Sequence, residues 1–425
     1  MSKLILFEVK KMWNTTFFRI LLVALLIFSI AYYVFIYMNT TRVEDEIKPI
    51  KEDIQRTELT IEENKLALES AEDTEIEEIE GTLEFNENWL EERQIELRLL
   101  EEHNWDAFLQ KEIDQTEPDI GRMRYENQTH TYSHPTLFTL ETYVAMSKWM
   151  QEKDIVPLLP WDKYYSYVTL YDREVNSTSA AEAEKIMNYI KENSNKYSSA
   201  SIHYLFRLFG LLFSFIGAVF FLFLFGDIIT KEGLGRNGPI HLLRTQPIKQ
   251  YQILASKYLT VILTSLLLLL CAVIFSLIVG SIFDRLGDWD YPVLIYGEDR
   301  TFTLMGMGEV LIKATFLFML ILLFSYTILF LFSILTKRVL VAMGLTLGLL
   351  FIGMKMSGGL VTSSIAHYIP FQYFSVFEVV TNELALTLDN FNLTYTNGII
   401  SLGIASLVLL VVTYIISFVQ SKKGN

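Results

Sequence analysis

Residues 18–38 read FRILLVALLIFSIAYYVFIYM, an apolar run in which Arg19 is the only charged side chain. About 20 apolar residues in a helix are enough to cross the hydrocarbon core of a bilayer. The chain contains five further runs of this kind. Together they predict an all-α polytopic membrane protein with six transmembrane helices, at residues 18–38, 203–228, 256–282, 309–335, 338–357 and 397–419.

The N-terminal residues 1–17 predict an amphipathic elbow helix that precedes the first span. Its apolar side chains, such as Leu6 and Trp13, can face lipid while Lys10 and Lys11 reach toward the headgroups. No small-residue cleavage site follows residue 38, so we expect the first span to be retained as an uncleaved signal anchor.

Basic residues near the span ends predict the orientation, because cytoplasmic connections are enriched in Lys and Arg. Such residues precede the first span and follow the sixth, and they also fill residues 229–255 and 336–338. These basic clusters all lie on the same side of the membrane only if the chain crosses it six times. We therefore predict a protein of the cytoplasmic membrane whose termini, including the tail 420–425, are cytoplasmic, and whose external connections are 39–202, 283–308 and a re-entrant segment at 358–396.

The connection between the first two spans is a large acidic domain. Residues 39–200 hold 37 acidic and 17 basic side chains, a net charge of −20 against −14 for the entire chain. This negative charge fits two interpretations. The domain could attract cationic molecules electrostatically, or the acids could simply cover a helical surface that faces water. The lone Cys271 lies in the third span, so this domain has no disulfide, which favours a Gram-positive surface.

Two heptad stripes occupy the first part of the acidic domain. One follows Ile47, Ile54 and Ile61, and the second follows Ile79, Leu83 and Leu90. Apolar residues at this spacing predict an antiparallel coiled-coil hairpin over 43–112. Residues 113–200 contain four prolines and many aromatic residues, which favours a compact helical base.

The cytoplasmic segment between spans 2 and 3 reads GDIITKEGLGRNGPIHLLRTQPIKQYQILASK at 226–257. It resembles the coupling segment of ABC-2 type permeases, the membrane subunits of bacterial ABC transporters. The order of spans, the elbow helix and the stretch Pro370–Phe374 resemble the same family. The resemblance implies that the residues contacting the ATPase are Asp227, Glu232, Arg236, Leu243, Pro247, Ile248, Lys249 and Lys257.

The chain contains no GxxxxGK[ST] phosphate loop, so we expect it to bind no nucleotide and to have no ATPase activity of its own. The resemblance implies that ATP and Mg²⁺ are bound by a separate ABC ATPase subunit, present in two copies, and that this chain pairs with itself or with a related permease. Membrane lipids are the other expected partner, and nothing indicates nucleic acid binding.

Charged residues inside the spans are few. Glu309 and Lys313 lie one helical turn apart near the outer end of span 4, and Lys355 lies near the outer end of span 5. They could form a charged cluster in the outer leaflet or could be snorkelling side chains of structural value only. His130 and His134 have the spacing of a metal pair but no further ligand, so we expect no metal site. The sequence also lacks a nucleophile elbow, an HExxH motif and a CxxC motif, so we expect no catalytic residues.

Two functions remain open from the sequence. The first is the permease subunit of an ATP-driven exporter for an amphipathic peptide or a lipid-like substrate. The alternative is a mechanotransmitter or antibiotic sensor, whose external hairpin is moved by ATP hydrolysis without transport.

Overall fold

The computed structural model describes residues 2–70, 76–126, 135–162, 169–174, 185, 188, 196–230, 250–336, 338–361, 363 and 365–423. The chain divides into two compact units. The first comprises residues 1–35, 199–289 and 293–425, and the second comprises 36–198 and 290–292.

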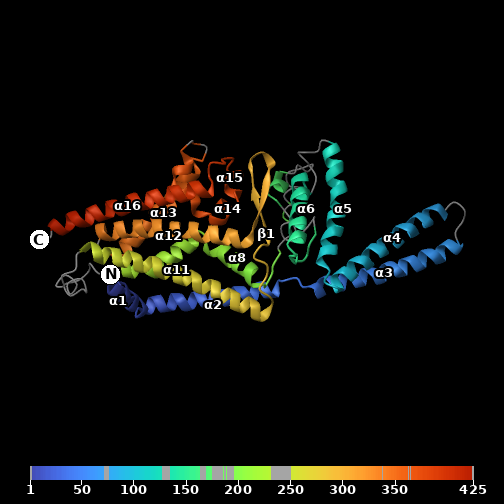
Figure 1. The fold of residues 1–425 in the computed structure, drawn as a ribbon, viewed down its shortest axis with the longest axis horizontal. Coiled ribbons are helices and arrows are strands. Elements are labelled where there is room, and N and C mark those ends of the chain that lie inside the picture. The colour runs from blue at the N-terminus through green and yellow to red at the C-terminus, as the bar shows by residue number, and fades with distance from the viewer. Residues whose placement is uncertain are drawn as a thin grey trace. The chain divides into compact units, whose positions relative to one another are not determined.

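The first unit is built from long apolar helices (Figure 1). Its elements are α1 (Ser2–Trp13), α2 (Thr16–Met38), α8 (Ser201–Leu212), α9 (Phe215–Thr230), α11 (Gln250–Phe283), the two-stranded sheet β1 (Pro292–Tyr296) and β2 (Phe302–Gly306), α12 (Met307–Thr336), α13 (Val339–Gly358), α14 (Val376–Val380), α15 (Glu383–Thr387) and α16 (Tyr395–Lys423). The most buried of the long helices is α12, which packs against α9, α13 and α16 and so forms the centre of this unit.

Five described helices are long and apolar enough to cross a membrane, and the count becomes six if α8 and α9 together form one bent span. The prediction of a helical protein with several membrane spans is therefore confirmed. Its six spans correspond to α2, the pair α8 and α9, α11, α12, α13 and α16. The side of the membrane on which each connection lies stays a prediction.

The second predicted span differs from the structure, because residues 203–228 do not form one straight helix. A bend of 77° separates α8 from α9. Gly217, in the first turn of α9, lies against the carbonyl group of Leu212 so closely that a Cβ atom would overlap it. The bend thus requires a residue without a side chain. Hydropathy alone could not show this, since the apolar run is continuous through it.

The connection 283–308, which is predicted to be external, is the exception to an all-α fold, because it contains the hairpin β1–β2. At the start of its turn, the Gly297 amide donates a hydrogen bond of 2.8 Å to the Thr301 carbonyl, which lies at the end of the turn. The third predicted span also differs in length. Helix α11 begins at Gln250, so residues 250–255 belong to this helix and not to the connection.

Between residues 366 and 387 the chain forms short helical pieces that pack on the long helices. The ring of Phe371 lies over Gly353 of α13, and the ring of Tyr373 lies over Gly398 of α16. The Gln372 amide donates to the Ser357 carbonyl at 2.6 Å. These contacts hold the predicted re-entrant stretch Pro370–Phe374 against both helices.

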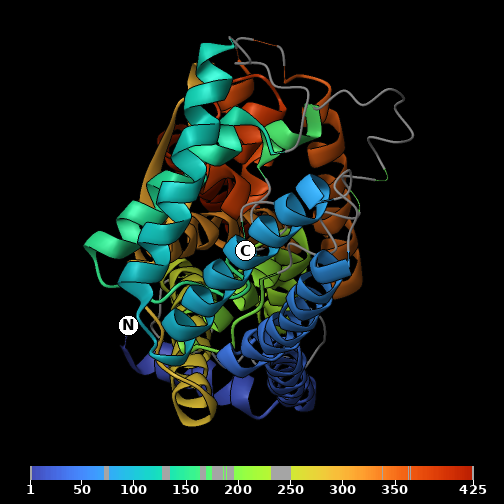
Figure 2. The ribbon, with the colours of Figure 1, turned by 90° about the vertical axis from the view of Figure 1, so that its right-hand side faces the viewer.

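The second unit contains α3 (Val43–Ser70), α4 (Ile76–Glu101), α5 (Trp105–Tyr125), α6 (Leu137–Glu152) and a 3-10 turn at Leu170–Glu174. Helices α3 and α4 lie side by side and run antiparallel (Figure 2). Two ion pairs show this direction, Lys51–Glu101 at 2.7 Å and Lys65–Glu87 at 2.8 Å. The lysine that comes later in α3 pairs with the glutamate that comes earlier in α4.

Helix α5 begins inside the range predicted for the hairpin. Asn104 caps it, since its side chain accepts a hydrogen bond of 3.2 Å from the Ala107 amide. The paired helices are therefore 43–70 and 76–101, and residues 105–112 belong to α5 rather than to the pair. Helix α5 packs against α6 through the apolar side chains of Ile113, Ile120, Met123, Leu137, Leu140 and Val144.

A buried carboxylate, Asp172, ties the 3-10 turn to the start of α6. It accepts hydrogen bonds from the Thr136 amide at 3.0 Å and from the Thr169 amide at 2.7 Å. The hydroxyls of Thr136, Thr139 and Thr169 donate to it as well. Asp172 is only 2% exposed, so these donors replace the water that the charge has lost.

Candidate functional site

The predicted coupling segment lies between the end of α9 and the start of α11. Glu232, Arg236, Leu243, Pro247, Ile248 and Lys249 lie outside the described residues. Asp227 belongs to the last turn of α9. Lys257 lies in the second turn of α11 and is 6% exposed, so its side chain packs within the helical unit. The structure therefore places the two helices that the segment connects, and the contacts of the segment itself stay predictions.

The first half of the bent pair is anchored at its N-terminus. The free amides of Ser201 and Ile202 donate to the carbonyls of Arg285 and Leu286 at 2.9 and 3.1 Å. These carbonyl groups follow the end of α11. They accept hydrogen bonds from the first amides of α8, which have no partner within that helix, as a capping side chain would. The Tyr204 hydroxyl also donates to the Ser29 carbonyl of α2 at 2.7 Å. The start of α8 is thus fixed to both α2 and α11.

A small apolar pocket of about 320 Å³ lies among α11, α12 and α16. Most of its lining is aliphatic or aromatic, including Leu254, Phe330 and Leu410. Two of its polar groups bond each other, because the Tyr258 hydroxyl lies 2.7 Å from the Thr327 hydroxyl, and the Thr413 hydroxyl donates to the Leu409 carbonyl of its own helix. An apolar pocket of this kind suits hydrocarbon rather than a charged group.

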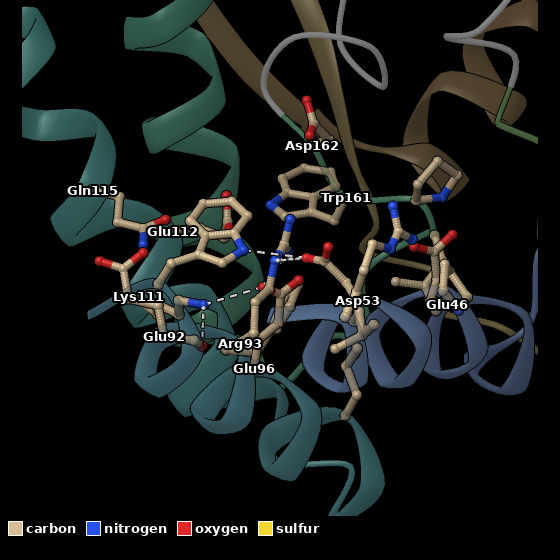
Figure 3. A pocket seen from close by; sticks show the side chains of 18 residues that line it. Glu46, Asp53, Glu92, Arg93, Glu96, Lys111, Glu112, Gln115, Trp161 and Asp162 are labelled. Carbon is tan, nitrogen blue, oxygen red and sulfur yellow. Dashed lines mark hydrogen bonds and ion pairs between the residues drawn. The ribbon is translucent and has the colours of Figure 1, made fainter. Parts of the chain in front are cut away.

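A larger polar pocket of about 910 Å³ lies in the second unit, between α3, α4, α5 and residues 159–162 (Figure 3). Six carboxylates and three cationic side chains line it. The carboxylates therefore outnumber the cations, and the pocket is acidic. The carboxylates are Glu46, Asp53, Glu92, Glu96, Glu112 and Asp162, and the cations are Arg56, Arg93 and Lys111.

Two of the carboxylates are already compensated by two of the cations. Arg93 contacts Asp53 at 3.3 Å and Glu96 at 2.8 Å. Lys111 contacts the same oxygen of Glu96 at 3.3 Å. The guanidinium of Arg93 also lies over the ring of Trp89, at 4.4 Å from its centre. Figure 3 draws the interactions among these pocket residues as dashed lines.

Two other carboxylates of the pocket, Glu46 and Glu112, have raised pKa values. Burial raises the pKa of Glu46, and the charges of Glu96, Asp45 and Asp162 raise it further. Burial also raises the pKa of Glu112, although a 2.7 Å hydrogen bond from the Tyr143 hydroxyl and the charge of Lys111 oppose this. Both groups resist ionisation, first because they are buried and second because other acids lie near them.

The comparison with known proteins connects this architecture to a family. Residues 10–419 match the model of the ABC-2 family transporter protein. This match covers nearly the whole chain and includes all of the helices that could span a membrane. The chain belongs to the ABC-2 transporter family. No curated protein and no solved structure matches the chain.

Membership in the ABC-2 family makes the chain a membrane subunit of a transporter, and it confirms the resemblance seen in the sequence. The family implies an ABC ATPase as a separate partner subunit. This agrees with the lack of a phosphate loop in the sequence.

The predicted outer-leaflet cluster of this ABC-2 protein is only partly assembled. Glu309 and Lys313 form an ion pair of 2.8 Å on α12. Lys355 is an exposed residue of α13, and within the described residues it makes no ion pair with Glu309. The same part of the chain contains no group of three or more potential metal ligands. His130 and His134 lie outside it.

Sequence reasoning missed the polar pocket of the ABC-2 protein. Its walls come from residues 46–56, 89–100, 108–115 and 159–162, which only the packing of three helices brings together. The acidic composition was visible in the sequence, but most of those acids lie on exposed helix faces. One local signal was available: Trp161 and Asp162 directly follow Pro160, where a tryptophan and a carboxylate are adjacent in a non-helical segment.

Proposed function

We propose that this chain is the permease subunit of an ATP-driven exporter for an amphipathic peptide or a lipid-like substrate. The family match over residues 10–419 carries the proposal. In this reading the protein lies in the cytoplasmic membrane with both termini in the cytoplasm. Two ATPase subunits bind a pair of permeases, each pair consisting of two identical chains or of this chain and a related one.

The arrangement of α8, α9 and α11 supports a coupling role for residues 231–249. These residues connect the end of α9 to the start of α11, and they are the longest stretch between two consecutive spans on the predicted cytoplasmic side. An ATPase that moves this connection would tilt both helices. The apolar pocket beside Tyr258 and Thr327 supports a substrate with a hydrocarbon part.

Binding to the ATPase can be tested with the coupling segment. The chain is coexpressed with a candidate ABC ATPase subunit, and the two are copurified from detergent-solubilised membranes. Deletion of residues 235–249 should abolish copurification, whereas replacement of Lys422 and Lys423 in the tail by Gln should not. Unchanged copurification of the deletion variant would contradict a coupling role for this segment.

Export is tested in inverted membrane vesicles that contain the complex. A labelled amphipathic peptide should accumulate inside them when ATP is added, and not when a non-hydrolysable analogue is added. ATP hydrolysis without accumulation of peptide or labelled lipid would argue against an exporter.

One observation favours the second candidate, a mechanotransmitter. The far half of the α3–α4 pair exposes large apolar side chains, with Leu59 and Leu66 each 61% exposed and Phe85 67% exposed. Leu59 and Leu66 are one heptad apart and so share a face of α3, which suits contact with another protein. Replacing all three by Ser should abolish signalling in a mechanotransmitter, while an exporter should keep ATP-dependent accumulation of its substrate.

A further inference from the structure

We propose that Trp289 and Asp290 form a mechanical joint, which connects the central helix α12 of the first unit to α6 of the second unit. Trp289 is held by α12, Asp290 is held by α6, and one peptide bond connects the two residues. Through this joint, a displacement of the first turn of α12 would be passed to the second unit. The proposal goes beyond the proposed function, because it applies equally to an exporter and to a mechanotransmitter.

One half of the joint is a close contact between Trp289 and the first turn of α12. The Gly308 amide donates a hydrogen bond of 2.8 Å to the Trp289 carbonyl. The indole ring of Trp289 lies against Gly308 so closely that a Cβ atom there would be 1.9 Å from the ring. Because only glycine leaves room for the ring, both the backbone and the side chain of Trp289 are fixed to the start of α12.

The other half of the joint is made by two side chains of α6 that hold Asp290. The Trp149 indole N–H donates to the Asp290 carbonyl at 2.9 Å. The Lys153 ammonium lies 3.6 Å from the Asp290 carboxylate and 4.1 Å from the centre of the Trp149 ring. Trp149 and Lys153 are four residues apart, so they lie on one face of the helix. This face of α6 therefore holds both the backbone and the side chain of Asp290.

The segment that carries Asp290 is too short to absorb a displacement. The chain leaves the first unit after Trp289 and belongs to it again from Val293. Strand β1 already begins at Pro292 and pairs with β2, whose last residue directly precedes α12. Consecutive Cα atoms are only about 3.8 Å apart. When the start of α12 moves, Asp290 must follow it or lose its contacts with α6.

The two contacts of α6 with Asp290 differ in strength. The ion pair joins side chains that are 37% exposed for Lys153 and 61% exposed for Asp290, and exposed ion pairs contribute little because water screens them. The hydrogen bond from the Trp149 indole is shorter, and its acceptor is a backbone carbonyl that cannot rotate away. We therefore expect Trp149 to provide most of the attachment, so that Trp149→Phe alone has a larger effect than Lys153→Gln alone.

The test measures the distance between α6 and α12 by double electron–electron resonance on the full chain in nanodiscs. The single cysteine is removed by Cys271→Ser, and spin labels are attached through Glu152→Cys on α6 and Ile312→Cys on α12, both of which are exposed positions. An excess of unlabelled chain without cysteine is added, so that the measured pairs lie within one chain. We expect a single narrow distance distribution.

A double variant then breaks the joint on the side of α6. Trp149→Phe with Lys153→Gln keeps an aromatic ring but removes the indole donor and the ammonium group. We expect it to broaden the distance distribution about twofold or more, because the second unit can then open away from the joint.

The matched control changes the same residue types elsewhere in the second unit, by Trp105→Phe with Lys148→Gln. Trp105 packs on Phe108 of its own helix, with ring centres 6.0 Å apart, and Lys148 pairs with Glu117 at 2.7 Å. Neither contact involves residues 290–292, so we expect this control to keep the narrow distribution. Hydrogen exchange of the α5 amides at residues 105–125 checks that the second unit stays folded in both double variants.

The side of α12 is tested by Gly308→Ala, since the added Cβ atom must displace the Trp289 ring. This variant should also broaden the distribution. Gly403→Ala on α16 is its control, because a Cβ atom there meets nothing within 4 Å. A folded Gly308→Ala variant with the narrow distribution would contradict the role of Trp289.

Three results on the α6 side would overturn the proposal. A broad distribution in the parent chain would show that α6 does not hold the joint. A narrow distribution in the Trp149→Phe with Lys153→Gln variant would show that the chain crossings at residues 35–36 and 198–199 hold the units instead. Equal broadening in the matched control would show a general loosening of the second unit. The experiment uses no ATPase and no substrate, so its outcome does not depend on the proposed export function.

Discussion

Gly217 of α9 lies against the carbonyl oxygen of Leu212, the last residue of α8, with no room for a Cβ atom between them. This contact fixes the 77° bend that divides the second span. Any other residue at position 217 would have to open the bend or displace the end of α8.

Replacing Gly217 should therefore damage the first unit. We expect Gly217→Ala to destabilise the chain by about 2 kcal/mol or more, in the range of overpacked cores. The measurement is the thermal unfolding midpoint in detergent, followed by size-exclusion chromatography with tryptophan detection. Gly210→Ala on α8 is the control, because a Cβ there meets nothing within 4 Å. Equal behaviour of the two variants would contradict the steric role of Gly217.

Asp172→Ala should destabilise the second unit. The substitution leaves two buried backbone amides and three hydroxyls without their common acceptor, and we expect a cost of about 3 kcal/mol or more. Hydrogen exchange of the α6 amides at residues 137–152 reports this locally. Asp154→Asn at an exposed position is the control. Unchanged protection of α6 in Asp172→Ala would show that the carboxylate does not hold this helix.

The stability of the second unit should fall as the pH rises above 4.5, the ordinary value for a glutamate. The pKa values of Glu46 and Glu112 are raised in the folded chain, so the folded state binds more protons than the unfolded state in this window. Their contribution is most favourable below 4.5 and is lost as the pH rises through the raised values. The unfolding midpoint of the wild type should therefore change more steeply over this range than that of Glu46→Gln with Glu112→Gln. Identical slopes would rule out this origin.

The ion pair between Glu309 and Lys313 should contribute little to stability. The Glu309 side chain is 59% exposed, and exposed pairs are worth about 0–1 kcal/mol. We expect Lys313→Met to shift the unfolding midpoint only slightly and to leave ATP-dependent accumulation of substrate intact. A large loss of transport with an unchanged midpoint would instead give this pair a functional role.

The long helices could be predicted from the sequence because their signals are local. The apolar runs at 18–38 and 309–335 correspond closely to α2 and α12, and the heptad stripes correspond to α3 and α4. Each of these patterns is repeated within one element, so no knowledge of the neighbours is needed.

The missed features depend on contacts between distant residues. The bend at Leu212 depends on how Gly217 meets a carbonyl group, which leaves no trace in hydropathy. The start of α5 depends on a single cap at Asn104. The acidic pocket depends on three helices and residues 159–162 converging, and its carboxylates look like any others in an acidic domain.

The hydrogen bonds from Ser201 and Ile202 to Arg285 and Leu286 have a mechanical consequence. The start of α8 is joined to the end of α11, the end of α8 meets α9 at the Gly217 bend, and residues 231–249 connect α9 back to α11. Because the start of α8 is bonded to the residues that follow α11, a tilt of α9 relative to α11 must change the angle at Gly217, bend a helix or break the hydrogen bonds at Ser201.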